Sequence, residues 1–164
     1  MSETASILDE IDRFEVHFDT LEVGQSFRTP ARTVTEADIV NFAGLSGDYN
    51  ALHTDAPYAE GTPHGGRIAH GLLVLAIVSG LSTRLPVMKA MERTLLGLAE
   101  LRCRWRRPTK IGDTLHVRLE IVEKKPSSKP DRGTLVMRRS AVNQNGETVM
   151  ESDWSLVLRR ADNA

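Results

Sequence analysis

The sequence predicts an α+β fold in which a curved antiparallel sheet wraps around one long buried helix. The first observation is a run of seven apolar residues, Leu72 to Val78. A helix that is apolar around nearly its whole circumference is buried on most sides, so other elements must cover it. The second observation lies after residue 100, where four runs alternate apolar and polar residues. That period of two is typical of strands with one buried face.

Composition and charge narrow the class of protein. The 164 residues are 40% hydrophobic and 26% charged, which suits one globular domain with a single core. We therefore expect one domain over residues 1–164, with residues 1–13 as a polar lead-in. A net charge of −1 leaves no electrostatic footprint for nucleic acid. The single cysteine, Cys103, excludes an intrachain disulfide and a cysteine-based zinc site, and we expect it in the core on a strand.

No targeting or membrane-spanning segment is evident in this sequence. The first five residues lack the basic stretch and apolar core of a secretory signal. The apolar stretch 68–81 is too short to span a bilayer, and Arg67 and Arg84 bracket it. We therefore expect a cytoplasmic protein that does not bind membranes.

The first predicted helix opens at Thr35-Glu36-Ala37-Asp38. Thr35 can cap it, and Asp38 lies three residues on, as in a capping box. Ile39, Val40, Phe42 and Ala43 supply its apolar face, and Gly44 and Gly47 are predicted to end it. A loop follows directly, so polar residues there would be held by a packed helix.

The second predicted helix runs from Gly71 to about Leu85, and the strands follow it. The alternating runs cover residues 101–106, 114–121, 134–142 and 148–158. Asn145-Gly146 between the last two runs is a strong hairpin signal. Residues 126–131 are predicted to form a longer connection.

Asp48, Asn50 and His53 are the residues that best indicate chemistry. A carboxylate and an imidazole five residues apart are a natural pair for moving protons. Gly71 begins the buried helix, where unpaired N–H groups and the positive end of the helix dipole favour an oxyanion. Together these features suggest proton transfer beside a polarised carbonyl group.

The segment from His53 to Ala59, continued by Gly65-Gly66-Arg67-Ile68-Ala69-His70-Gly71, resembles the MaoC-like dehydratases. That family includes the (R)-specific enoyl-CoA hydratases and has a hot-dog fold. The Gly-Asp-x-Asn-x-x-His signature spans residues 47–53, and the resemblance covers about residues 34–81. Two positions depart from the family pattern: Ala51 stands where proline is usual, and His64 where phenylalanine is frequent.

The resemblance implies a hydro-lyase of fatty acid metabolism that reversibly hydrates a trans-2-enoyl thioester to an (R)-3-hydroxyacyl thioester. Asp48 and His53 would act together on one water, with Asn50 fixing the loop or the water. The family position of Ser79 offers a hydroxyl to the site, and Tyr58 and His70 would shape the pocket. We expect no metal and no cofactor other than the coenzyme A or acyl carrier protein of the substrate, and a homodimer or an assembly of dimers.

Other interpretations of these residues stay open at this point. A hot-dog thioesterase would use a carboxylate to activate water against the thioester carbonyl itself. A non-catalytic acyl-binding subunit is a third possibility, which the intact Asp48 and His53 disfavour. The basic run of Arg102, Arg104, Arg106, Arg107 and Lys110 is either a solvated strand face or a contact for coenzyme A phosphates or an acidic carrier protein. Of this run, Arg104, Arg106 and Arg107 are the candidates for substrate binding.

Overall fold

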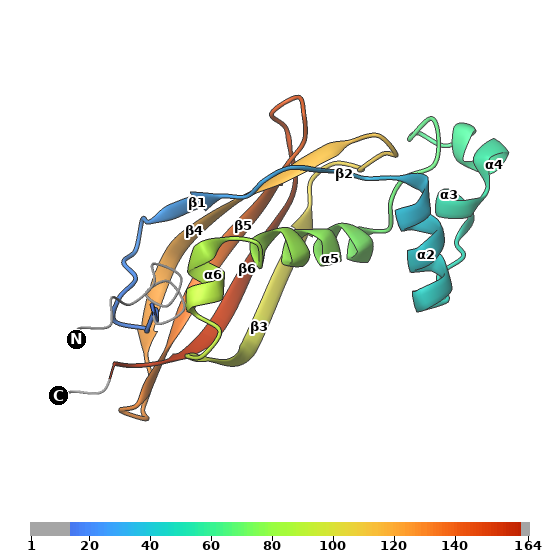
Figure 1. Ribbon diagram of the computed structural model, residues 1–164. Helices are drawn as coiled ribbons and strands as arrows, with labels where there is room; N and C mark the ends of the chain where they lie inside the picture. The colour runs from blue at the N-terminus through green and yellow to red at the C-terminus, as the bar shows by residue number, and fades with distance from the viewer. Residues whose placement is uncertain (1–13, 162–164) are drawn as a thin grey trace, which may run out of the picture.

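The computed structural model of the protein describes residues 14–161 and contains a six-stranded antiparallel sheet (Figure 1). The predicted lead-in, residues 1–13, lies outside the described residues. The strands are β1 (Ser26–Arg28), β2 (Arg32–Thr33), β3 (Leu95–Trp105), β4 (Thr114–Pro126), β5 (Arg132–Val142) and β6 (Thr148–Arg159). Their spatial order is β1-β4-β5-β6-β3, and β2 also pairs with β4. Strand β3 is last in this spatial order and is therefore an edge strand of the described sheet.

Five helices complete the described fold: α2 (Glu36–Ser46), α3 (Ala51–Thr54), α4 (Ala56–Glu60), α5 (Gly71–Ser82) and α6 (Pro86–Ala90). Helix α5 lies along the sheet and contacts β4, whereas α2, α3 and α4 gather beyond its N-terminal end (Figure 1). This arrangement confirms the predicted α+β class. Helix α5 ends at Ser82 rather than near Leu85, because the chain turns there and Pro86 starts a separate helix. Within residues 14–161 no helix is long and apolar enough to span a membrane.

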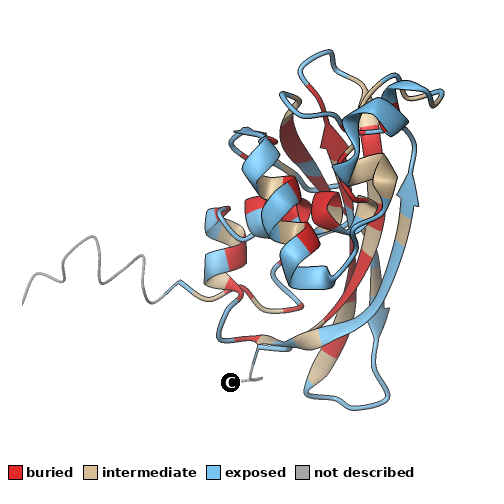
Figure 2. Ribbon diagram, turned by 90° about the vertical axis from the view of Figure 1, so that its right-hand side faces the viewer, coloured by how far each residue is buried: buried red, intermediate tan, exposed pale blue. Residues whose placement is uncertain are grey.

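The alternation predicted for the paired strands is confirmed. On β4, Leu115, Val117, Leu119 and Ile121 are all fully buried, and on β6 the face carrying Met150, Trp154, Leu156 and Leu158 is buried as well. Buried residues concentrate between the helices and the sheet (Figure 2). The apolar run predicted as a buried helix thus packs on the predicted strand faces.

Strand β3 departs from the prediction that each alternating run has a buried face. Leu101 and Trp105 are 36% and 46% exposed, and Cys103 is only half-buried rather than in the core. The physical reason is position: among the strands of residues 14–161, β3 pairs with β6 alone and lies at the edge of the sheet, while α5 lies over β4. Alternation identifies a strand with two faces, but it does not say what covers them.

The first helix begins as predicted and ends later. The Thr35 hydroxyl accepts a hydrogen bond from the N–H of Asp38, and the Asp38 carboxylate accepts one from the N–H of Thr35, completing the capping box. Gly44 lies inside α2 instead of ending it. Gly47 ends the helix, with a positive φ of 75° that a residue without a side chain adopts easily. The loop that contains Asp48 therefore starts from a defined helix end.

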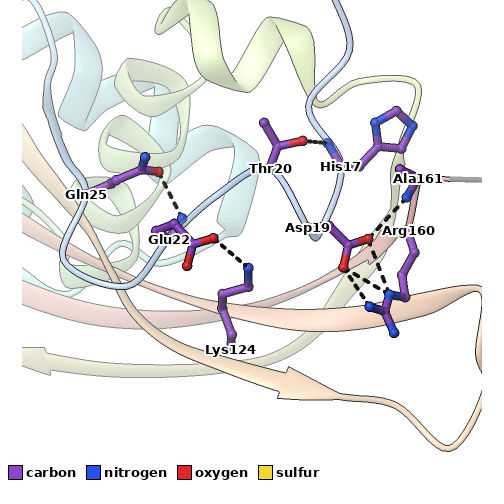
Figure 3. A network of polar contacts seen from close by, with 8 residues as sticks. All are labelled: His17, Asp19, Thr20, Glu22, Gln25, Lys124, Arg160 and Ala161. Carbon is purple, nitrogen blue, oxygen red and sulfur yellow. Dashed lines mark hydrogen bonds and ion pairs between the residues drawn. The ribbon is translucent and has the colours of Figure 1, made fainter. Parts of the chain in front are cut away.

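The connections between the last three strands also agree with the local sequence. Gly146 adopts φ 78° in the turn that joins β5 and β6, as the Asn145-Gly146 pair predicts. Residues 127–131 connect β4 to β5. The segment before β1 is tied to the far end of the sheet, where Arg160 donates to the Asp19 carboxylate at 2.8 Å and Lys124 lies 3.7 Å from Glu22 (Figure 3).

Candidate active site

The connection between α2 and α5 brings Asp48, His53 and His70 together. Each offers a side-chain oxygen or nitrogen atom, and these atoms all lie within 4.8 Å of one another. The loop is braced by its own polar groups: the Asp48 carboxylate accepts a hydrogen bond from the N–H of Asn50, and the Asn50 side chain caps α3 by accepting one from Leu52. Asn50 thus fixes the loop, and the pair predicted from spacing is adjacent in space.

One ring nitrogen of His53 is hydrogen-bonded, and the other has no hydrogen-bond partner in residues 14–161. Its Nδ1 lies 2.7 Å from the backbone oxygen of Ile68. A carbonyl oxygen can only accept, so Nδ1 carries the hydrogen and Nε2 of the neutral ring keeps its lone pair. His53 is half-buried, and its free Nε2 is the atom in this group best suited to take a proton.

His70 contacts both members of the predicted pair. It is only 2% exposed, and its Nε2 donates to the backbone oxygen of Asp48 at 2.9 Å. Its ring stacks on that of His53, with centroids 3.8 Å apart, and the Phe42 ring lies 5.0 Å away. His70 Nδ1 is buried without a hydrogen-bond partner in the described part of the chain. His70 therefore supports the loop that carries Asp48.

Gly71 begins α5, and Trp105 packs against it. His70, the residue before the helix, makes no side-chain hydrogen bond to the first turn, and none of the residues 14–161 accepts from the Gly71 N–H. The Trp105 indole N–H donates to the Gly71 carbonyl at 2.9 Å, and a Cβ added to Gly71 would lie 2.9 Å from the indole ring. Trp105 was not among the site residues predicted from the sequence. Its position as an aromatic residue within a basic run was a signal that could have indicated a role in binding.

An open groove with a volume of about 410 Å³ passes over this position. His53, Gly71 and Trp105 line it together with the cationic pair Arg106 and Arg107. The remaining lining residues are His64, Ile68, Ala69, Val74, Pro108 and Thr109. The groove therefore brings His53, the start of α5 and two arginines together.

The basic residues predicted to bind substrate do not all lie at this groove. Arg106 is bonded to Glu151 at 2.7 Å, and Arg107 lies 3.4 Å from Glu147, so both charges on the groove are partly compensated. Arg104 does not line this groove; it borders a separate hollow with Arg102 and Arg138. Arg106 borders both, because strand alternation puts it on the same face as Arg102 and Arg104, and it follows the end of β3 at Trp105.

Two supporting candidates lie away from the groove. Tyr58 is 54% exposed on α4, and its N–H donates to Asp55 at the start of that helix. Ser79 is half-buried on α5, two turns beyond Gly71, and does not line the groove. Neither side chain contacts Asp48, His53 or His70 through any hydrogen bond in residues 14–161.

Asp48, His53 and His70 also have the donor types of a metal site. His53 Nδ1 and His70 Nε2 are hydrogen-bonded to the backbone oxygens of Ile68 and Asp48, so each imidazole has one other ring nitrogen. The planes of the two rings are 32° apart, and their centroids are 3.8 Å apart. The same side chains have the chemistry that proton transfer needs.

Comparison with known proteins connects this geometry to a family. Residues 18–142 match the model of the MaoC like domain. The chain is 40% identical over 111 residues to protein MaoC of Klebsiella aerogenes, a match covering 68% of this chain but only 32% of that longer protein. It is 32% identical over 143 residues to the (R)-specific enoyl-CoA hydratase of Rhodospirillum rubrum, covering 87% of this chain and 91% of the hydratase.

A solved structure identifies the fold. The chain superposes with a TM-score of 0.75 on a Mycobacterium tuberculosis protein that has a double hot-dog fold. The sequences are 24% identical, and the match covers 92% of this chain and 46% of the other. The curved sheet around α5 is accordingly a hot-dog fold, as the sequence resemblance implied.

Proposed function

This chain belongs to the MaoC-like domain family and is a hydro-lyase, and from that premise we propose which reaction it catalyses and how. The reaction is the reversible hydration of a trans-2-enoyl thioester to an (R)-3-hydroxyacyl thioester, in the cytoplasm, with coenzyme A or acyl carrier protein as the carrier. The observation that carries the proposal is the proximity of the His53 and Asp48 side chains, with ligand atoms within 4.8 Å of one another, and the presence of His53 and Gly71 in one groove.

Asp48 and His53 act on one water. His53 Nε2 takes a proton from the water, and the oxygen of that water forms the bond to the β carbon of the enoyl group. The Asp48 carboxylate accepts a hydrogen bond from the other water hydrogen, which stays on the oxygen, and stabilises the positive charge that develops on His53. His53 then returns its proton to the α carbon, so the elements of one water are added and the site regains its starting charge.

Negative charge builds on the thioester oxygen as the water adds, and the Gly71 N–H donates a hydrogen bond to that oxygen. The first N–H groups of a helix have no intrahelical acceptor, and the helix dipole adds positive potential there. Donors aimed at developing charge supply much of the rate enhancement in such sites. Trp105 stabilises the conformation of this helix start through the Gly71 carbonyl.

The protein acts as a homodimer in this proposal. Strand β3 exposes an unpaired edge, and Leu98, Leu101 and Trp105 on it are exposed. An open edge with apolar side chains is a surface that proteins normally cover. Because Trp105 lies on this strand and also in the groove, a second copy would border the groove directly.

Two assays on crotonyl-CoA test the proposed reaction. Loss of the conjugated double bond, followed by ultraviolet absorbance, reports hydration, and a thiol reagent reports release of free coenzyme A. We expect rapid loss of conjugation without thiol release. Thiol release would instead identify a thioesterase, and no reaction with short or long enoyl chains on either carrier would identify an acyl-binding subunit.

A further inference from the structure

Arg139 is a buried cation that the proposed reaction does not use. Its residue exposure is 2%, and its Nε is buried without a hydrogen-bond partner in residues 14–161. No carboxylate in that part of the chain pairs with it. Burial lowers the pKa of its guanidinium to about 10, so the group still carries a positive charge near neutral pH. A buried charge without a partner destabilises a folded protein, so its presence here suggests that a ligand supplies the partner.

The surroundings of Arg139 are apolar with a few polar atoms. Its guanidinium carbon lies 3.9 Å from the centre of the Trp154 ring. Ser152, buried opposite Arg139 on β6, accepts a hydrogen bond from the Trp154 indole. Its strand neighbours Met137 and Ala141 belong to two different apolar clusters, so Arg139 lies where the two halves of the core meet. Stacking on an aromatic face stabilises the charge but leaves the in-plane N–H donors unused.

The position of Arg139 restricts what can reach those donors. It lies on the inner face of β5, the middle strand, with β4 on one side and β6 on the other. A second copy of the chain at the β3 edge would be separated from it by β6. Arg139 shares its strand face with Met137 and Ala141, and Ala141 belongs to the same apolar cluster as Val74 and Ile77 of α5, so an acyl chain bound beside α5 would lie on the Arg139 side of the sheet.

The sheet register relates Arg139 to the thioester position. Trp105, which contacts Gly71, is in register with Met150 and, through it, with Ala141. Arg139 is two residues further along β5, about 7 Å along the strand, and two strand spacings, about 10 Å, across the sheet from Trp105. A six-carbon acyl chain together with the long arginine side chain can cover that separation. Along α5, the half-buried residues Leu75 and Ser79 follow Gly71 on the same face, at the spacing of successive turns.

We propose that Arg139 binds a carboxylate at the far end of the acyl chain, so that the preferred substrates are enoyl thioesters of short dicarboxylic acids. This inference rests on the proposed hydratase function and names its substrate class. The guanidinium can hold a carboxylate through two parallel N–H donors, and the apolar surroundings strengthen such a pair. The Ser152 hydroxyl and the half-buried Cys103 lie in register with Arg139, across β6 and β3.

Matched substrates test the proposal on the wild-type protein. The coenzyme A thioesters of trans-2-hexenoic and trans-2-hexenedioic acid differ only in whether the chain ends in a methyl group or a carboxylate. An eight-carbon pair extends the same comparison. We expect kcat/KM to favour the dicarboxylic thioester by at least about tenfold, the scale of one hydrogen-bonded charge contact. Equal rates, or a preference for the methyl-ended chain at both lengths, would overturn the inference.

Variants then assign the preference to this residue. Arg139→Met keeps the length of the side chain and removes the charge, a replacement that cores tolerate well. We expect it to prefer the methyl-ended chain, with the change confined to the dicarboxylic substrate. Arg138→Met is the control, because Arg138 lies on the outer face paired with Asp153 and should leave the preference unchanged.

The outcomes separate this inference from the proposed function. If the wild-type protein hydrates both chains without preference, only the role of Arg139 is wrong. If it hydrates neither, the proposed function itself is wrong. If Arg139→Met slows both substrates equally or weakens only the assembly of the protein, Arg139 is a structural residue and the inference fails.

Discussion

The Nε2 atom of His70 lies 2.9 Å from the backbone oxygen of Asp48, so a buried residue next to α5 holds the loop that carries the carboxylate of the proposed acid/base pair. The same ring stacks on His53. One side chain therefore positions both groups of the proposed acid/base pair, and the next residue, Gly71, starts the helix proposed to bind the oxyanion.

Two substitutions separate the two contacts of His70. His70→Phe keeps a flat ring against His53 but loses the donor to Asp48, whereas His70→Gln keeps a donor and loses the stack. We expect His70→Phe to lower kcat by roughly 10²-fold, because small displacements of catalytic groups are costly, while KM changes little. His70→Gln should retain more activity. Steady-state kinetics at several pH values checks this, and a His70→Phe protein with full kcat would show that the hydrogen bond is dispensable.

Asp48→Asn and His53→Ala should each reduce kcat by roughly 10²–10⁴, the usual contribution of a positioned acid or base. Because both groups act on one water, the double variant should be little slower than the slower single variant. Crotonyl-CoA hydration is the measurement, and thermal unfolding should change only modestly. Asp55→Asn, at an exposed helix cap near the site, is the control and should stay active. Near wild-type rates in either single variant would remove that residue from the mechanism.

Gly71→Ala tests the oxyanion position. The new Cβ would lie 2.9 Å from the Trp105 indole, so the ring must move and its hydrogen bond to Gly71 must weaken. We expect a loss in kcat/KM of roughly 10²–10³, comparable with loss of one oxyanion donor. The double variant with Trp105→Ala removes the clash with the indole. It should stay impaired if the methyl group occupies the space of the thioester carbonyl, and full recovery would attribute the effect to Trp105 alone.

The open edge of β3 predicts a homodimer at micromolar concentration, with a mass twice the 18.2 kDa of one chain. Sedimentation equilibrium measures this directly. Leu101→Lys places a charge on the exposed edge and should weaken the dimer, since lysine on an edge strand opposes pairing. Val23→Lys adds the same charge at an exposed position before β1, at the other end of the strand order, and is the matched control. A stable monomer in the wild-type protein would contradict the prediction.

His116 predicts a specific dependence of stability on pH. Burial lowers the pKa of this imidazole, and the positive charges of Arg28 and Arg118 lower it further. The unfolded chain therefore takes up the proton first as the pH falls below about 6.5. The contribution of neutral His116 is complete above that pH and is lost as the pH falls through its lower folded pKa. In urea unfolding, His116→Gln should lose less stability than the wild-type protein over this range. An unchanged pH dependence would contradict the assignment.

Local signals in the sequence determined much of the framework. The Thr35–Asp38 capping box, the end of α2 at Gly47 and the turn at Gly146 all depend on neighbours within a few residues. The alternation of β4 and β6 determined which side chains face the core. The Asp48–His53 pair was also predictable, because a short loop between the end of α2 and α3 keeps both residues close.

Only the tertiary structure decided which distant residues complete the site. His70 reaches the Asp48 carbonyl from 22 positions away, and Trp105 reaches Gly71 from 34 positions away. Strand alternation assigns Arg139 to a face, but an arginine at a core position has no local signal that says whether its charge will find a partner. These outcomes depend on how α5 lies over the sheet and on β3 being its edge. Such placement arises from the packing of the whole core, which no short segment encodes.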